Sequence, residues 1–238
     1  MNMTVFLTIF SNPVLLDFIR GPLVWLSFII FGLGLIVQTF RLLKLTQIKE
    51  TRRFAPKEAI VPQTDLSKRE RFFRRLAFLK ITVIRHNACM VMFSVFFHVC
   101  LVITPIFLLG HSVLLDTSFG FSFISFSGKI SDTMTMIVLM CGLVFLLRRL
   151  LLRRVRIIST AHDYILLFVA IAPFLTGYLA HHHIFNYNMM IILHILSGEL
   201  MLVMIPFSKF FHMVFFFVSR FMIVSEHSMG SPKRSWQF

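Results

Sequence analysis

Histidines are the residues in this sequence whose type and spacing could carry out chemistry. The chain has ten histidines among 238 residues that are 57% hydrophobic. Ionisable side chains inside membrane-length apolar stretches are costly, which makes them functional candidates. Imidazole nitrogens bind iron and relay protons, so either chemistry is open to them. Five of the ten lie in or at the ends of two apolar stretches: His86, His98, His111, His194 and His212.

Two of these histidines share one stretch and are 18 residues apart, at His194 and His212. At about 100° per residue, this spacing returns to the same face of a helix. The rise is roughly 27 Å, nearly the thickness of a membrane. A binuclear metal site needs its ligands close together, so the spacing favours two separate cofactors, one near each side of the membrane.

The other stretch supplies a partner for each member of this pair. His98 and His111 are 13 residues apart, roughly 20 Å of helical rise. His111 lies at the outer end, level with His194, and His98 lies deeper and is the better match in depth to His212. Four imidazoles paired by depth predict bis-histidine ligation of two b-type haems. Thirteen residues turn through about 220°, and Pro105 between the two histidines can kink the helix and re-aim one ring.

His86 is the alternative inner ligand on this stretch. By the same rise per residue, His86 overshoots the depth of His212 by about 10 Å, whereas His98 falls about 7 Å short. We prefer His98 because it is embedded in apolar sequence, while His86 lies between Arg85 and Asn87. A single membrane histidine is more often a packing residue or a proton relay, so the interpretation depends on all four residues together.

Two other groups of potential metal ligands have simpler interpretations. The run at 181–183 is His-His-His in a polar turn, where solvated side chains are expected rather than a metal site. The three cysteines are Cys89, Cys100 and Cys141, and they form neither a CxxC pair nor a CxxCH motif. The sequence therefore argues against iron–sulfur clusters, structural zinc and covalently attached haem.

Five apolar stretches must position these histidines. Each is close to the 20 residues needed to cross a hydrocarbon core, and in lipid such a stretch must be a helix. We predict an all-α integral membrane protein, a five-transmembrane-helix bundle. Residues 1–20 form an interfacial segment, 44–85 a basic loop and 219–238 a tail. The haem-binding membrane domain covers 21–218, with spans at about 22–43, 87–110, 132–150, 162–180 and 189–216.

The basic residues predict the orientation of the bundle. With the basic loop counted from Arg41 to residue 85 as inside, 22 of the 24 Lys and Arg residues lie on the inner side, and Arg20 and Lys129 lie outside. The positive-inside rule then places the N-terminus outside and the C-terminus in the cytoplasm. The net charge is +14, and the basic residues that produce it flank the apolar stretches. They therefore indicate membrane topology, or a surface that binds anionic lipid or an acidic partner, rather than nucleic-acid binding. The N-terminus lacks the pattern of a removable signal peptide.

Several segments resemble a known family. RVRIISTAHDYILL at 154–167 and HILSGELMLVMIPFSKFFHM at 194–213 resemble the gamma subunit of respiratory nitrate reductase. FHVCLVITPIFLLGH at 97–111 is similar to its Phe-His and Gly-His segments, although the histidines here are further apart. Most of residues 20–225 look closer still to the cytochrome b subunits of transmembrane redox complexes of sulfate reducers, such as the high-molecular-weight cytochrome c complex.

The resemblance implies a five-helix dihaem cytochrome b with its N-terminus outside. His111 and His194 would ligate the outer haem, and His98 and His212 the inner one. Electrons would exchange with menaquinone and pass to a cytoplasmic iron–sulfur protein or a periplasmic multihaem cytochrome c, beside another membrane subunit. The resemblance also places Gly110 next to a quinone site, with Lys129 as a weaker match near it.

Four further residues have a physical logic of their own. Arg85, Arg148 and Arg149 lie at the inner boundary, where they could pair with haem propionates or act as topology anchors. Glu199 is an acid within the fifth span, suited to proton transfer or to a bond with a neighbouring helix.

We therefore predict a dihaem b-type cytochrome subunit of a respiratory complex in the bacterial inner membrane. Any enzymatic chemistry would be quinol oxidation or quinone reduction. One alternative is a haem-containing electron wire with no quinone site. A second is a proton-coupled transporter, which the odd number of spans disfavours because such transporters are built from paired repeats. A third is a structural anchor without cofactor, which the spacing of the histidines argues against.

Overall fold

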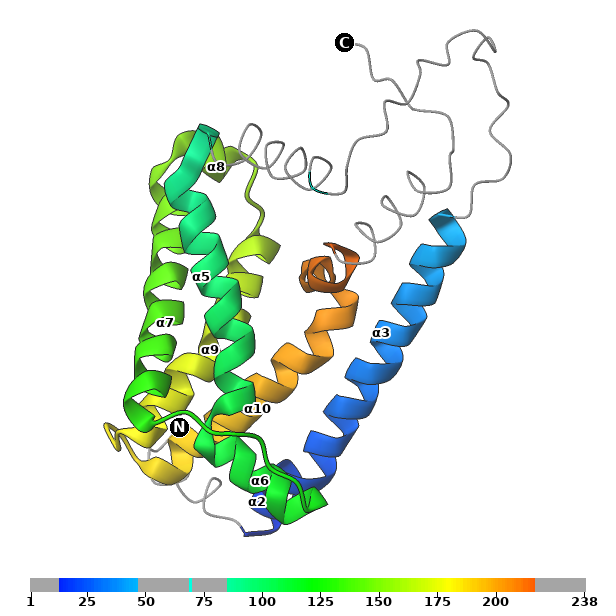
Figure 1. Cartoon of the computed structure of the whole chain (residues 1–238), viewed down its shortest axis with the longest axis vertical. Helices are drawn as coiled ribbons and strands as arrows, with labels where there is room; N and C mark the ends of the chain where they lie inside the picture. Colours follow the sequence, from blue (N-terminus) through cyan, green and yellow to red (C-terminus); the bar gives the residue numbers. More distant parts are fainter. Residues whose placement is uncertain (1–12, 47–68, 70–84, 217–238) are drawn as a thin grey trace, which may run out of the picture. The chain divides into compact units, whose positions relative to one another are not determined.

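A computed structural model describes residues 13–46, 69 and 85–216 of the chain (Figure 1). Every element in these ranges is a helix. Five helices are long and apolar enough to cross a membrane: Pro13–Lys44, Asn87–Phe107, Gly128–Leu151, Ala161–His181 and Tyr187–Phe207. The prediction of an all-helical protein with five membrane-length helices is confirmed for the described residues. The interfacial segment predicted at 1–20 lies partly outside the described residues, as do most of the basic loop and all of the tail.

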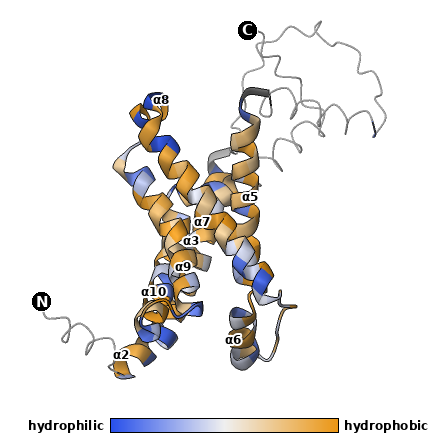
Figure 2. Cartoon of the chain, turned by 90° about the vertical axis from the view of Figure 1, so that its left-hand side faces the viewer, coloured by the Kyte–Doolittle hydropathy of each residue, from blue (hydrophilic) through white to orange (hydrophobic). Residues whose placement is uncertain are grey.

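Large apolar side chains cover the outer surface of these helices. Trp25, Phe40, Phe96 and Phe168 are each more than half exposed. Figure 2 shows hydrophobic residues along the length of the helices and hydrophilic ones gathered on short elements such as α8, Arg153–Ile157. Exposed apolar faces of this extent suit a lipid environment, in which the helix satisfies its own backbone.

The chain divides into two compact units, which we describe separately. Unit 1 comprises residues 1–48 and 160–238, and unit 2 comprises residues 49–159. His194 and His212 belong to unit 1, whereas His98 and His111 belong to unit 2.

In unit 1, α10 (Tyr187–Phe207) packs against both α9 (Ala161–His181) and α3 (Val24–Thr46). The first span is continuous from α2 (Pro13–Phe18) through the π-helical turn η1 (Ile19–Leu23) into α3. Pro22 lies inside this π turn, where its missing N–H disturbs the regular ladder. Gly34 of α3 meets Pro206 of α10 so closely that a Cβ at residue 34 would lie 2.6 Å from Pro206 Cγ.

Side-chain caps define where α9 and α10 begin. Thr160 and Asp163 form a reciprocal capping box at the start of α9. The Asn186 side chain accepts a hydrogen bond from Met189 N at the start of α10. These bonds satisfy backbone N–H groups that the first helical turn leaves without partners, so both boundaries follow from the local sequence.

In unit 2, α5 (Arg85–Phe107) packs against α7 (Gly128–Leu151). The rings of Phe97 and Phe145 meet edge to face, with their centroids 5.3 Å apart. The same two helices also carry the buried residues Cys100, Val138 and Cys141. The short helix α6 (Leu109–Phe119) follows α5 and ends at Gly120, whose φ of +72° suits glycine. Ser112 Oγ donates to Phe123 O and ties the following loop to α6.

Two predicted spans are interrupted where the sequence suggested continuous helices. The span predicted at 87–110 breaks at Leu108, whose ψ of 129° is extended, so His111 lies on α6 rather than on α5. The span predicted at 189–216 ends at Phe207, and Ser208 is extended before the 3-10 turn η3 (Lys209–Phe211). Each break follows within three residues of a proline, which cannot donate to the helical ladder.

Candidate functional site

The four candidate histidines share one feature of hydrogen bonding: each Nδ1 lies within bonding distance of a backbone carbonyl. A carbonyl oxygen can only accept, so Nδ1 must be the donor, and in the neutral ring the lone pair then lies on Nε2. This is the tautomer that an Nε2 metal ligand needs, and carbonyls commonly orient such ligands. The bonds are His98 to Ser94 O at 2.6 Å, His111 to Pro105 O at 2.8 Å, His194 to Pro173 O at 2.8 Å and His212 to Lys209 O at 2.7 Å.

His194 is held between two helices of unit 1. It projects from α10 onto the backbone of α9 at Pro173. A Cβ built on Gly177 would lie 2.9 Å from both Nδ1 and Cε1 of His194, so the missing side chain makes room for the ring. Ser197 Oγ donates to His194 O at 2.9 Å and lies 3.3 Å from Thr176 Oγ1. The ring position is therefore set by a glycine notch and a carbonyl on α9.

His111 depends on the break between α5 and α6. Because α5 ends at Phe107, the Pro105 carbonyl is among the last four of that helix, which have no helical donor. The His111 ring, two residues into α6, supplies a donor to that carbonyl at 2.8 Å. The break thus both moves His111 off the axis of α5 and creates the acceptor that orients it.

His212 follows the interruption at Ser208 and bonds the carbonyl of Lys209, three residues earlier. Lys209 Nζ in turn lies 2.7 Å from Asp163 Oδ1, an ion pair between η3 and the start of α9. Oδ2 of Asp163 accepts from the backbone N of Thr160. One carboxylate therefore caps α9 and fixes the residue whose carbonyl holds His212.

His98 lies on the regular part of α5. Its Nδ1 bonds the carbonyl of Ser94 one turn earlier, and its ring meets Phe97 edge to face at 5.5 Å. The side chain is exposed on the helix surface. His86 precedes Asn87, whose φ of −155° interrupts the helix, and the His86 side chain lies outside the described part of the structure. The choice between His98 and His86 stays a prediction.

The interruptions change the geometric argument made from the sequence. An 18-residue interval returns to one helix face only along a regular helix, and extended Ser208 breaks the helix between His194 and His212. The interval between His98 and His111 crosses the break at Leu108. The four histidines are therefore related by their shared hydrogen-bond pattern and not by helical phase.

The remaining predicted site residues lie at helix ends. Gly110 is in the first turn of α6, and Lys129 is exposed in the first turn of α7. Arg148 is half-buried in the last turn of α7, and Arg149 Nη1 donates to Ser159 Oγ at 3.1 Å. Arg85 begins α5, and its side chain is outside the described part of the chain.

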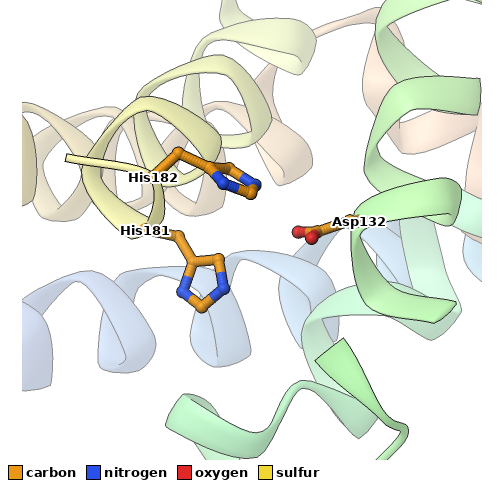
Figure 3. A group of neighbouring side chains, drawn as sticks. All are labelled: Asp132, His181 and His182. Atoms are coloured by element: carbon orange, nitrogen blue, oxygen red, sulfur yellow. The ribbon is translucent and has the colours of Figure 1, made fainter. Parts of the chain in front are cut away.

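The histidine run at 181–183 forms aromatic contacts at the end of α9. Figure 3 shows the imidazoles of His181 and His182, whose ring centroids are 5.1 Å apart. His182 lies 4.3 Å from the Tyr178 ring, and His183 lies 5.2 Å from that of Tyr187. Figure 3 also labels Asp132, which belongs to α7 in unit 2. All three imidazoles are exposed, and the expectation that they form no metal site stays a prediction.

Three features of the site escaped the reading of the sequence. The ion pair between Asp163 and Lys209 joins residues 46 positions apart, and no local sequence pattern predicts it. The contact of Gly177 with His194 likewise depends on how α9 and α10 pack. The capping box was missed as well, although its signal is local, because Thr160 stands three residues before Asp163 at the start of an apolar run.

A protein from Nitratidesulfovibrio vulgaris (strain Hildenborough) is 33% identical to this chain over 217 residues. The match covers 85% of this chain and 89% of that protein. The chain belongs to the family of that protein. Membership of this family brings no activity with it. No family model matches the chain. No solved structure matches it either.

Proposed function

We propose that the chain is a dihaem b-type cytochrome, the membrane subunit of a respiratory electron-transfer complex. The observation that supports the proposal best is the hydrogen-bond pattern that four imidazoles share: in each, Nδ1 donates to a backbone carbonyl. A bond from Nδ1 to a carbonyl leaves the lone pair on Nε2, and an axial ligand requires this tautomer because its Nε2 lone pair must face the iron.

The donor set fits a non-covalently held haem. Imidazole is the usual axial ligand of b-type centres, and no thiolate is required. The three cysteines are free, and Cys100 and Cys141 are buried in unit 2. When bound, haem supplies one-electron transfer, and the chain would supply ligation, orientation and exclusion of water. In this proposal His111 and His194 ligate one haem, and His98 and His212 the other.

The proposed orientation follows the distribution of basic residues. An N-terminus outside and a cytoplasmic C-terminus place the haem of His111 and His194 near the outer surface. Electrons would enter there from menaquinol or a periplasmic cytochrome c and leave to an acidic iron–sulfur protein on the inner side. A wire without a quinone site shares the same ligands. Titration of the haem spectrum with a quinone analogue separates the two, because a wire would give no spectral change.

Single His→Ala substitutions test the ligand set. Each of the four variants should lose one b haem or convert it to a high-spin form, as measured by pyridine haemochrome and absorption spectra. His162→Ala is the matched control, because His162 is exposed in the first turn of α9 and is expected to leave both haems in place. Retention of two low-spin haems in the His194→Ala variant would refute the assignment.

The inner ligand and the orientation need separate measurements. If His98 is the inner ligand of unit 2, His98→Ala loses the haem that His212→Ala loses, and His86→Ala loses none. The reverse result assigns the role to His86. Reporter fusions after residue 238 should report the cytoplasm, and a periplasmic signal would overturn the proposed topology.

A further inference from the structure

Glu199 is a buried acid that the ligand set does not use. It lies in the middle of α10, and 7% of its surface is exposed. Neither carboxylate oxygen has a hydrogen-bond partner among the described residues. A carboxylate without partners is among the costliest groups to place inside a membrane, whereas a neutral carboxyl is far cheaper. An acid kept there without a structural bond calls for a functional reason.

The position of Glu199 relates it to His194. Glu199 follows His194 by five residues on the same helix, roughly 7.5 Å along the axis. Ser197 lies between them and bonds both the backbone of His194 and the Thr176 hydroxyl. A charge on Glu199 is therefore close enough to act electrostatically on a redox centre at His194, at a depth where the dielectric constant is low.

The other titratable groups near α10 lie toward the ends of the elements packed against it. Asp163 is already paired with Lys209. Within the described residues, these groups are Arg20 of η1, Arg41 and Lys44 of α3, His162, Asp163, Tyr164, Tyr178 and His181 of α9, and Lys209 of η3. Among the described residues of unit 1, Glu199 is the acid placed in the middle of a membrane-length helix.

We propose that Glu199 is a proton-binding site whose occupancy follows the electron on the haem that His194 would ligate. The inference deepens the proposed function and rests on it. An electron supplied by quinol or a chemical reductant adds negative charge near Glu199 and favours its neutral carboxyl. One proton is taken from the aqueous phase as the electron arrives, and it returns there as the electron leaves. The only bond that forms and breaks is the O–H bond of the carboxyl group.

The sign of the coupling is fixed by this charge balance. Over the pH range in which Glu199 binds a proton on reduction, reduction becomes harder as pH rises. The midpoint potential of one haem should therefore fall with increasing pH. Glu199→Gln is neutral at every pH, so its potential should stay near the value of the wild type at low pH. Asp116→Asn is the matched control, an acid-to-amide change at an exposed residue of α6.

The experiment is a redox titration of the full chain with its haems at several pH values. Wild type and Asp116→Asn should show one haem with a pH-dependent potential, and Glu199→Gln should lose that dependence. An unchanged dependence in Glu199→Gln would overturn the proposal. Haem is counted first in each sample, so a chain without haem refutes the proposed function and is recognised as such.

A second measurement needs no variant. Reduced-minus-oxidised infrared spectra of wild type should contain a protonated carboxyl band that shifts when glutamate is labelled with ¹³C. Glu199 is the glutamate that lies within the five membrane-length helices. The absence of a label-sensitive band in a sample with two haems would show that Glu199 is not coupled to the redox state and would overturn the proposal.

Discussion

Gly177 offers the sharpest structural test of how His194 is held. In Gly177→Ala, the new Cβ would lie 2.9 Å from Nδ1 and Cε1 of His194, closer than real Cβ contacts allow. The ring must move by several tenths of an ångström, and its 2.8 Å bond to Pro173 O must lengthen. The imidazole would then lose both its orientation and its space.

The magnitude combines three effects. Overpacking a well-filled site costs about 1–3 kcal/mol. Weakening a hydrogen bond costs about 1 kcal/mol. Replacing glycine by alanine in a helix returns about 1 kcal/mol. The net loss of stability is therefore about 1–3 kcal/mol. Because the bond from Nδ1 orients the proposed ligand, affinity for that haem should fall about 10–100-fold.

The assay is haem content by pyridine haemochrome together with a redox titration of the purified variant. Gly198→Ala on α10 is the control, because a Cβ there meets nothing within 4 Å. The control should keep both haems and unfold no more easily than wild type. A Gly177→Ala protein with two haems at wild-type potentials would refute the idea that the notch at Gly177 positions His194.

Two further predictions concern contacts within unit 1. Asp163→Asn and Lys209→Gln should each lower the occupancy of the haem proposed to bind His212. The double variant should lose no more haem than the worse single variant, because both substitutions remove the same ion pair. Additive losses of haem content would contradict this. Gly34→Ala, whose Cβ would lie 2.6 Å from Pro206 Cγ, should destabilise the packing of α3 on α10 by about 1–3 kcal/mol, and an unchanged unfolding midpoint relative to an alanine substitution at an open glycine would contradict it.

The five spans could be predicted because the bilayer leaves few choices. An apolar stretch of about 20 residues must become a helix in lipid, so length and composition decide. The third span was expected at 132–150 and is Gly128–Leu151, and the fourth was expected at 162–180 and is Ala161–His181. Their ends are set by local caps such as Thr160 with Asp163, which the sequence displays.

The breaks in the other spans could be predicted only in part. Pro105 indicated a kink, but the helix ends at Phe107, Leu108 is extended, and a new helix begins at Leu109. Pro206 gives no rule for the extended Ser208 that follows it. Where a helix resumes after a proline depends on which carbonyls find donors elsewhere, and here the donor to Pro105 O is the side chain of His111.

The histidines were identifiable from their type and burial cost, but not the way they are oriented. Helical phase placed His194 and His212 on one face, and the interruption at Ser208 removes that argument. The carbonyl partners come from three kinds of backbone: a preceding turn for His98, a helix end for His111 and a neighbouring helix for His194. Contacts of the last kind need a tertiary structure.

The central claim is tested most directly by counting haem. The full chain, purified in detergent from a host that makes haem b, is examined by a dithionite-minus-air spectrum and by pyridine haemochrome. The account predicts two b haems per chain, both low-spin with the spectrum of bis-imidazole ligation. A folded, helical preparation that contains no haem would contradict it.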